Sequence, residues 1–153
     1  MADAPAAAQV LLQKIYLKDA SLEVPLAPQV FTRQWQPQVD VQLNTHTTEL
    51  AADAYQVMLR VTVTAKLGED TAFLAEVHQG GIFTLKGFSS PQDKAAALGA
   101  YCPGVVFPFA REAIAELVQR GGFPQLLLQP VNFDALYQQH LARAQPAPAP
   151  TQH

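Results

Sequence analysis

The clearest pattern in the sequence is the alternation of residue types from Tyr55 to Lys66. Apolar residues hold the odd positions, and polar residues hold the even positions except for Met58. A period of two sends successive side chains to opposite faces, so this segment is predicted to be a half-buried β-strand. Val39–Asn44 alternates in the same way and predicts a second strand, whereas residues 45–54 are polar and predict a turn.

The same alternation continues on both sides of this pair. Beyond a predicted hairpin loop at Gly68-Glu-Asp70, apolar positions recur from Phe73 to Leu85. Gly80-Gly81 interrupts that strand and indicates either a bulge or a close backbone approach. An earlier strand begins at Val10, and the change of its apolar phase predicts a bulge near Lys18-Asp19. Four successive strands without crossover helices predict an antiparallel meander.

Two large aromatic residues lie on a connection between strands. Pro25, Pro28 and Pro37 surround the segment that contains Phe31 and Trp35, and this proline content excludes a central strand. Connections normally carry little apolar bulk. The two side chains therefore belong either to the core or to a binding surface.

The second half of the chain changes to helical periodicity. Ser90 is a predicted N-cap for a helix from Gln92 to about Ala100, which Pro103 is expected to end. Pro108 then begins a second helix that reaches Arg120, with Gly121 as its C′ residue. A final helix is predicted to begin at Asn132, with apolar residues at Phe133, Leu136, Tyr137 and Leu141.

The helix that ends at Arg120 is strongly amphipathic. Its apolar stripe consists of Ala110, Ala113, Ile114, Leu117 and Val118. We expect this stripe to be divided between the helix's own sheet and another subunit. The fold class predicted from these patterns is α+β, a four-stranded antiparallel sheet with helices packed on one face.

Length and composition fit one domain with short flanking segments. We predict a flexible N-terminus at 1–9, a folded domain at 10–143 and a disordered Pro/Ala tail at 144–153. Of the 153 residues, 49% are hydrophobic and only 15% are charged, against an ordinary charged share of about 25%. This deficit favours oligomerisation or an apolar binding face.

Charge and cysteine content exclude several classes of protein. The net charge is −3, and no basic stripe interleaves with aromatic residues, which argues against a nucleic-acid partner. The single cysteine fits a reducing compartment. We find neither a signal peptide nor the ~20 apolar residues of a membrane span, so the protein is expected in the cytoplasm without direct membrane insertion.

The sequence contains no recognisable catalytic or metal-binding motif. The four histidines are scattered, and no phosphate-binding glycine loop is present. Cys102 could act with a distant histidine as a nucleophile, or it could be a small buried hydrophobic residue. Glu76 and His78 share one face of a strand, where solvated charge is the ordinary interpretation. No cofactor and no metal are predicted.

Several long motifs in order resemble the SecB protein-export chaperone family, from about residue 10 to 142. The motifs are Ile15-Tyr-Leu-Lys-Asp-Ala-Ser-Leu-Glu-Val-Pro25, Leu59-Arg-Val-Thr-Val-Thr64, Gln79-Gly-Gly-Ile-Phe83, Tyr101-Cys-Pro103, Phe107-Pro-Phe-Ala-Arg-Glu112 and Pro130-Val-Asn-Phe-Asp-Ala-Leu136.

The resemblance implies a non-enzymatic, ATP-independent chaperone that forms a homotetramer, a dimer of dimers. Such a protein binds unfolded preproteins, keeps them competent for translocation and delivers them to SecA, the ATPase of the Sec export pathway. The final helix would act as a lid over an apolar channel for the unfolded client. The Pro/Ala tail departs from the acidic tail of many family members, and Ala75 stands where cysteine is common in the family.

The resemblance also implies roles for particular residues. The client-binding groove would comprise Phe31, Trp35, Val39, Val41, Tyr55, Val57, Leu59 and Tyr137. The SecA-binding surface would comprise Asp19, Glu23, Leu74 and Glu76. Residues linked to assembly and client binding would be Ala75, Val77 and Gln79. The helix that packs in the tetramer would use Ala110, Ala113, Ile114 and Leu117.

Two other hypotheses are compatible with the sequence. The first is a SecB-like chaperone dedicated to a single partner such as an antitoxin. The second is a small enzyme that uses Cys102 and a histidine.

Overall fold

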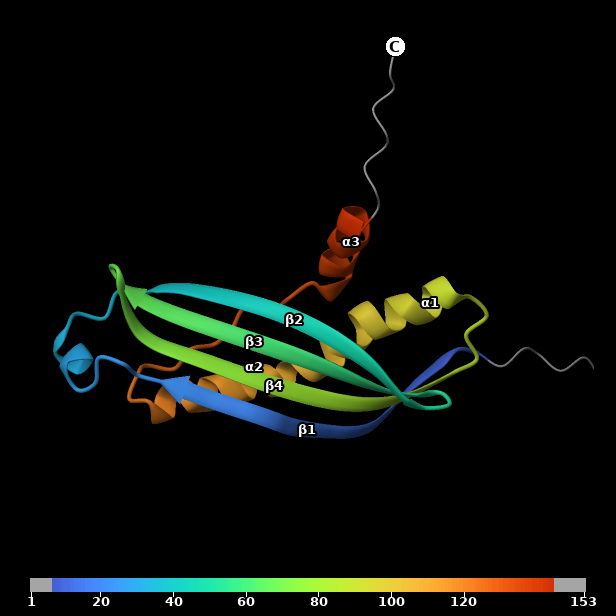
Figure 1. Cartoon of the computed structure of the whole chain (residues 1–153), viewed down its shortest axis with the longest axis horizontal. Coiled ribbons are helices and arrows are strands. Elements are labelled where there is room, and N and C mark those ends of the chain that lie inside the picture. Colours follow the sequence, from blue (N-terminus) through green and yellow to red (C-terminus); the bar gives the residue numbers. More distant parts are fainter. Residues whose placement is uncertain (1–6, 145–153) are drawn as a thin grey trace, which may run out of the picture.

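Figure 1 presents the computed structural model of the protein, which describes residues 7–144. Four long strands form one twisted antiparallel sheet in the spatial order β1-β4-β3-β2. Their bounds are β1 Gln9–Glu23, β2 Gln38–Ala51, β3 Ala54–Leu67 and β4 Asp70–Lys86. The predicted α+β class with a four-stranded antiparallel sheet is confirmed. β1 and β2 are the two edge strands, and β3 and β4 are central.

The alternation in the sequence becomes the two faces of this sheet. Val41 pairs with Val63, Val63 with Ala75, and Ala75 with Leu22, so these residues form one row on the helix-covered face. The odd positions of β3 from Tyr55 to Leu67 are all buried. The opposite face carries the polar positions, and we call it the open face.

The turn predicted at residues 45–54 is wrong, because β2 continues to Ala51. Its polar residues still pair with β3, from Thr45 opposite Leu59 to Glu49 opposite Tyr55. Polar side chains are tolerated there because an edge strand beyond the helix layer remains solvated on both faces. The actual turn is shorter and contains Asp53, whose φ of 62° is left-handed.

The predicted meander is correct only for β2, β3 and β4. β1 pairs with β4 and not with its sequence neighbour β2. A hairpin requires a loop of about two to five residues. The connection between Glu23 and Gln38 is longer and proline-rich, and it includes a short 3₁₀ helix at Gln29–Thr32. It therefore crosses the end of the sheet, where Figure 1 shows it as a separate lobe.

The irregularities in the sheet have local causes. β1 has register shifts between Leu17 and Asp19, as predicted, and also between Leu12 and Lys14. Gly80 marks a close approach, because a Cβ there would lie 2.4 Å from the ring of Tyr16. The Tyr16 hydroxyl donates a hydrogen bond to Oε1 of Gln56 across β4.

The helix layer is one long rod rather than two separate helices. α1 (Pro91–Ala96) leads through a π-helical segment, η2 (Ala97–Tyr101), into α2 (Cys102–Arg120). The prediction that Pro103 ends one helix and Pro108 begins another is wrong. The wider π turn before Pro103 relieves the clash that a proline ring makes with the carbonyl four residues earlier. Pro108 lies inside α2.

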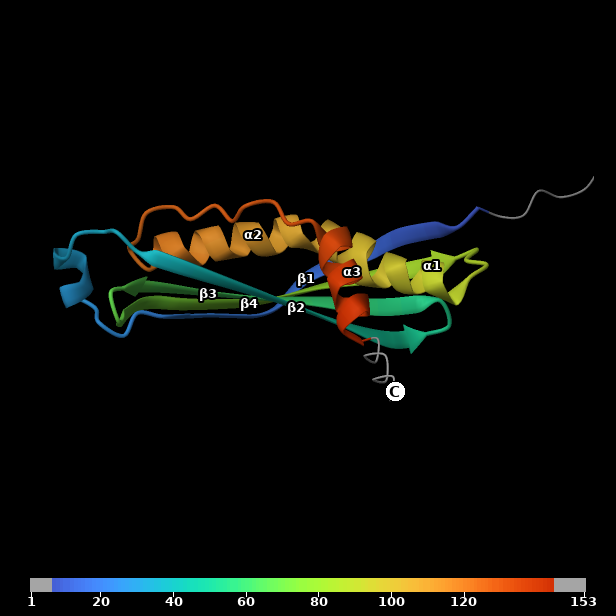
Figure 2. The ribbon, with the colours of Figure 1, turned by 90° about the horizontal axis from the view of Figure 1, so that it is seen from above.

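α2 lies along the sheet and closes the core. Figure 2 shows it on one side of the sheet only. Buried residues recur every four positions through Val106, Ala110, Ile114 and Val118. Burial of each larger aliphatic side chain contributes roughly 1.5–3 kcal/mol. α2 ends at Arg120 as predicted, but the left-handed glycine after it is Gly122 (φ 95°), because Gly121 keeps a helical backbone.

The chain then turns back along α2 to its last helix. Residues 123–132 form an extended connector that buries Phe123 and Leu128 (Figure 2). α3 (Phe133–Ala144) begins at the predicted cap, where the Asn132 side chain accepts a hydrogen bond from the Ala135 amide at 3.0 Å. Gln9 belongs to β1 and Ala144 to α3, so the ordered elements extend one residue beyond 10–143 at each end. Residues 1–6 and 145–153 of the predicted termini lie outside the described residues.

Candidate binding groove and acidic sheet face

An apolar groove has edge strand β2 on one side and the 123–132 connector together with α3 on the other. One part has a volume of about 490 Å³ and is lined by Val41, Leu43, Phe107, Leu128 and Leu136, among others. A second part of about 450 Å³ shares Leu43 and Leu136 and adds Gly99, Tyr137 and His140. The shared residues make the two hollows one continuous groove, which we call the β2 groove. Figures 1 and 2 show α3 standing beside the β2 edge of the sheet.

The groove exists because α2 does not extend over β2. On the helix-side face of β2, Val39 and Val41 remain 42% exposed, although their row partners on β3 are fully buried. β2 is also unpaired on its outer side among residues 7–144. Its amide and carbonyl groups therefore face the groove region beside exposed valines. This combination suits an extended apolar segment that adds to a sheet edge.

A cluster of four aromatic rings closes the end of the sheet where β2 begins. The ring of Phe123 lies 5.0 Å from those of both Trp35 and Phe73, and 5.3 Å from that of Phe31. Trp35 also stacks on Phe73 at 6.3 Å. Phe73 and Phe123 are buried, Trp35 is half-buried, and Phe31 is 50% exposed. The cluster thus combines a structural base with an exposed apolar edge.

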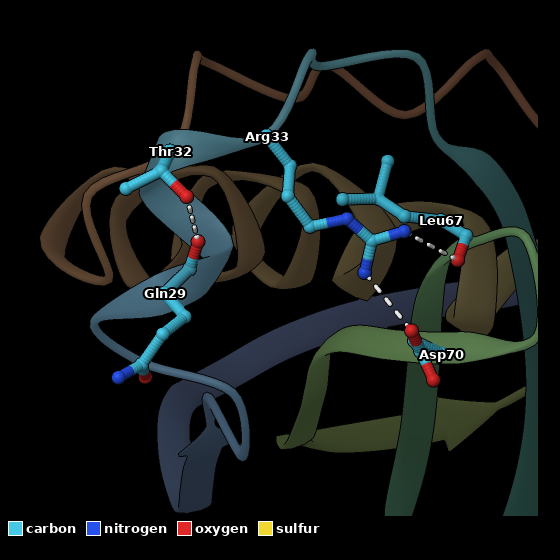
Figure 3. A network of polar contacts seen from close by, with 5 residues as sticks. All are labelled: Gln29, Thr32, Arg33, Leu67 and Asp70. Atoms are coloured by element: carbon cyan, nitrogen blue, oxygen red, sulfur yellow. Dashed lines mark hydrogen bonds and ion pairs between the residues drawn. The ribbon is translucent and has the colours of Figure 1, made fainter.

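Arg33 holds the aromatic connection against the sheet. Figure 3 shows its guanidinium reaching the β3–β4 turn, where Nη1 donates to Asp70 at 3.0 Å and Nη2 donates to the Leu67 carbonyl at 3.4 Å. The Thr32 hydroxyl donates to the Gln29 carbonyl at 2.7 Å and closes the short 3₁₀ helix. These contacts position Phe31 and Trp35, which flank Arg33 in the sequence.

The structure divides the predicted groove residues into three groups. Val41 and Tyr137 line the β2 groove, and Val39 lies further along the same strand. Phe31 and Trp35 form the aromatic cluster. In contrast, Tyr55, Val57 and Leu59 are core residues, with exposed fractions of 9%, 0% and 0%. In this conformation the helix layer covers these three side chains, so they support the groove from beneath and do not line it.

Several lining residues were not among those predicted, including Leu43, Leu136, Phe107 and Leu128. Leu43 continues the alternation of Val39 and Val41, and Leu136 belongs to the apolar stripe of the final helix, so both carried a sequence signal. Phe107 and Leu128 carried none, because their contribution depends on the path of the connector beside α2.

The four predicted acidic-surface residues gather on the open face of β1 and β4. Asp19 pairs with His78, Glu23 pairs with Leu74, and Glu76 lies between them along β4. Even positions of β4 point to this face, so the three carboxylates share it with the half-buried Leu74. We call this set the acidic patch.

Neighbouring side chains hold Glu76 in its ionised form. Oε1 accepts a hydrogen bond from the Thr62 hydroxyl at 2.9 Å, and Oε2 lies 3.2 Å from Nε2 of His78. These two hydrogen bonds, with Thr62 first, lower the pKa of Glu76 below its ordinary value, and the charges of His78 and Arg60 act in the same direction. The carboxylate is therefore fixed in orientation and charged.

The residues predicted to be linked to assembly and client binding lie on the opposite face from the acidic patch. Ala75 and Val77 are fully buried beneath α2, and the buried Gln79 donates a hydrogen bond from Nε2 to the Tyr16 carbonyl at 2.9 Å. Gln79 thereby satisfies a backbone carbonyl beside the bulge in β1.

The predicted tetramer helix residues separate by exposure. Ala110 and Ile114 are fully buried against the sheet of their own chain. Ala113 and Leu117 are half-buried, and with Leu17 and Ala20 of β1 they line a hollow of about 210 Å³. Only Ala113 and Leu117 of the four are available to another subunit.

The described residues offer little for catalysis or metal binding. Cys102 is fully buried, and removal from water raises the pKa of its thiol to about 12, so the nucleophilic thiolate is strongly disfavoured. Between residues 7 and 144, no group of three or more histidine, cysteine or carboxylate side chains is arranged to hold a metal ion. None of the helices formed by these residues is long and apolar enough to cross a membrane.

Comparison with known structures supports the observed fold. The chain is similar to a Mycobacterium tuberculosis SecB-like chaperone, Rv1957, solved in complex with a ChAD peptide from the Rv1956 HigA1 antitoxin. The TM-score is 0.67 at 16% identity, over 80% of this chain and 90% of that one. A protein of unknown function from Streptococcus agalactiae aligns with 13% identity and a TM-score of 0.42, over 81% and 99% of the two chains.

Comparison of the sequence with protein families assigns nearly the whole chain. Residues 3–144 match the family described as preprotein translocase subunit SecB. The match spans all four strands and all helices of the described fold. The chain therefore belongs to the SecB family, whose members are chaperones and not enzymes.

Proposed function

We propose that this protein is an ATP-independent chaperone that binds unfolded preproteins, keeps them competent for translocation and delivers them to SecA. The observation that carries the proposal is the β2 groove, an apolar channel beside an unpaired strand edge. An unfolded chain gains apolar burial from such a channel and backbone hydrogen bonds from the strand. Neither interaction requires a particular client sequence, and binding to the unfolded state holds a client without ATP.

Two leucines of α3 form a matched pair for testing the groove. Leu136 lines it and is 41% exposed, whereas Leu141 is 40% exposed and lines a different hollow, beside α1. Loss of the partial leucine burial on binding costs roughly 1 kcal/mol, or about fivefold in Kd. We expect Leu136→Ser to weaken binding of a reduced, permanently unfolded protein by that factor and Leu141→Ser to leave it unchanged. Equal affinities of the two variants in fluorescence titrations would contradict the proposed site.

The aromatic cluster would provide a second client contact. Trp35 is half-buried, so its exposed edge is available to an aromatic or aliphatic client side chain. Trp35→Ser is expected to weaken client binding while the oligomer survives, as measured by titration and light scattering. Unchanged client affinity would remove Trp35 from the site.

We further propose that SecA binds the acidic patch. The fixed carboxylate of Glu76 and the apolar Leu74 suit a basic segment with an apolar anchor, and such binding weakens with salt. Glu76→Lys is expected to reduce SecA affinity more than client affinity. Asp40→Lys makes the same charge change on the open face of β2 and is the control. Equal SecA affinities for wild type and Glu76→Lys would reject the assignment.

We also propose a tetramer, built as a dimer of dimers, which the same family resemblance supports. The exposed Leu17 and the half-buried Ala113 and Leu117 supply an apolar strip beside edge strand β1. Leu117→Glu is expected to lower the oligomeric state in sedimentation velocity. A wild-type protein that sediments as a monomer would contradict the tetramer.

The alternative is a chaperone dedicated to one partner, such as an antitoxin. The similar M. tuberculosis protein was solved with a peptide from an antitoxin. A panel of unrelated unfolded proteins separates the two functions. Comparable micromolar or tighter binding across the panel supports a general chaperone, and binding of a single sequence supports the dedicated one.

A further inference from the structure

Gly99 occupies a place in the helix layer where glycine is not required by the backbone. It lies in the π-helical segment η2, and its φ is not left-handed. Glycine inside a helix is destabilising relative to alanine, because it loses more conformational freedom on folding. A reason for glycine at this position must therefore come from its surroundings.

The surroundings of Gly99 are the ring of Tyr137. A Cβ at position 99 would lie 2.6 Å from both Cδ2 and Cε2 of that ring. Ordinary carbon–carbon contacts lie at about 3.5–4.0 Å, so alanine cannot be accommodated unless the ring retreats by about 1 Å or more. Both residues also line the β2 groove. The tyrosine thus rests directly on the helix backbone, within the wall of the groove.

α3 has few other attachments to the domain. Its first residue, Phe133, is buried and packs edge-on against Phe107 with ring centroids 5.7 Å apart. One turn later, Tyr137 rests on Gly99, and beyond it Leu141 is 40% exposed and faces α1 across a hollow of about 420 Å³. Two points fix the direction of a rigid helix. The contact at Gly99 therefore determines how far α3 leans from β2.

We infer that the contact between Gly99 and the Tyr137 ring sets the width of the β2 groove. This width in turn determines the size of the side chains that the groove admits. Gly99 and Tyr137 are positioning residues, since they act through the placement of Leu136 opposite Leu43. The inference rests on the proposed function only where it concerns clients. The placement of α3 can be measured without any client.

The test compares two glycine substitutions in the same helix layer. Gly99→Ala meets the Tyr137 ring at 2.6 Å, whereas a Cβ at Gly104 meets Phe133 at an ordinary 3.9 Å. Spin labels at exposed positions, introduced by Gln42→Cys and Ala142→Cys, report the distance from β2 to α3. Labelled protein is diluted with unlabelled protein so that each measured distance lies within one chain.

The expected displacement follows from leverage along α3. Ala142 lies about twice as far from Phe133 as Tyr137 does, so a ring displacement of about 1 Å becomes roughly 2 Å at the label. We expect Gly99→Ala to lengthen the distance by that amount and Gly104→Ala to leave it unchanged. Gly99→Ala/Tyr137→Ala removes the clashing ring and is expected to restore a distance distribution centred near the wild-type value, although broader.

Client selectivity is the second measurement. Two unfolded peptides differ only in having tryptophan or valine at their apolar positions. A wider groove favours the larger tryptophan side chain. We therefore expect the ratio of the valine-peptide Kd to the tryptophan-peptide Kd to be about fivefold larger in Gly99→Ala than in wild type, equivalent to roughly 1 kcal/mol. Gly104→Ala is expected to retain the wild-type ratio of affinities.

Each combination of results has a definite meaning. An unchanged label distance in Gly99→Ala overturns the inference, whatever the peptides do. A changed distance with unchanged peptide affinities supports the role of the Gly99–Tyr137 contact in placing α3 and contradicts the proposed client groove. If Gly99→Ala fails to fold, Tyr137→Ala alone removes the contact from the other side and is expected to broaden the distance distribution. A distribution as narrow as that of wild type in Tyr137→Ala overturns the inference.

Discussion

Replacement of Phe123 by alanine tests whether the aromatic cluster is the main support of the long connections. Phe123 is 6% exposed, and its ring has three aromatic neighbours at centroid distances of 5.0–5.3 Å. One neighbour, Phe73, belongs to β4, and two, Phe31 and Trp35, belong to the connection before β2. The substitution therefore removes the ring through which the connector after α2 contacts both the sheet and that connection.

The expected loss of stability is large but compatible with folding. Truncation of a buried phenylalanine to alanine costs about 3–5 kcal/mol, including the cavity that remains. Because three tilted ring contacts are lost, we expect at least the middle of that range, about 4 kcal/mol. A free energy of unfolding of about 5–15 kcal/mol then leaves a folded but weakened protein. With a urea m-value of about 2 kcal/mol per molar, the midpoint of unfolding should fall by roughly 2 M.

Urea unfolding at a fixed protomer concentration measures this loss, because association of folded chains would otherwise shift the midpoint. Phe109→Ala in α2 is the matched control. Phe109 is 42% exposed, so its truncation should cost only roughly 1–1.5 kcal/mol. A Phe123→Ala protein that loses no more than this control, at an unchanged m-value, would refute the view that Phe123 is the centre of the cluster.

Three further predictions concern electrostatics and reactivity. Thr62→Val removes the strongest cause of the lowered Glu76 pKa, so that pKa should rise in an NMR titration, while Thr64→Val should leave it unchanged. Ionised Glu76 stabilises the fold at pH values above its pKa in the unfolded chain, and this stabilisation is lost as the pH falls through its lower pKa in the folded protein. Thr62→Val should therefore also weaken the acid dependence of stability. Buried Cys102, with a pKa raised to about 12, should resist alkylation until the protein unfolds; rapid labelling in native buffer would contradict this. Arg33→Ala removes the exposed ion pair with Asp70 and the hydrogen bond to the Leu67 carbonyl, and should cost less than about 1 kcal/mol of stability. It should nevertheless accelerate limited proteolysis of the connection between β1 and β2. An unchanged cleavage rate would argue against the anchoring role of Arg33.

Most of the sheet could be predicted from the sequence, because alternation directly reports which face is covered. β3 is central and covered along its whole length, so its pattern is complete and its limits were predicted closely. The second half of β2 was missed because it lies beyond the helix layer. Without a covered face, its threonines and glutamate show no apolar alternation, and only pairing with β3 makes them a strand.

The helix layer shows where local rules mislead. Pro103 and Pro108 each predict a helix boundary, yet the helix continues through both. At Pro103 the preceding π turn changes the backbone geometry, and nothing in the composition of Ala97–Tyr101 announces a π turn. Burial of the α2 face against the sheet then outweighs the hydrogen bond lost at each proline.

The candidate sites differ in how far sequence could determine them. The acidic patch required only alternation and the pairing of β1 with β4, and its four residues do lie together. For the groove, the family likeness included Tyr55, Val57 and Leu59, which the helix layer covers. Which strand remains uncovered depends on the width of the helix layer relative to the sheet, a tertiary property that residue patterns do not contain.

Under the proposed function, the geometry of β2 would let one surface accept many clients without promoting aggregation. Val41 and Leu43 line the groove with Val39 on the same face, while Asp40 and Gln42 face the open side. A client strand added to this edge would therefore meet apolar side chains on one face and polar side chains on the other. Any unfolded segment with alternate apolar residues fits, whatever its exact sequence. α3 stands beside the same edge and would block the approach of another folded copy of this chain. The helix that bounds the groove therefore also protects the long exposed strand β2 from pairing with β2 of a second copy.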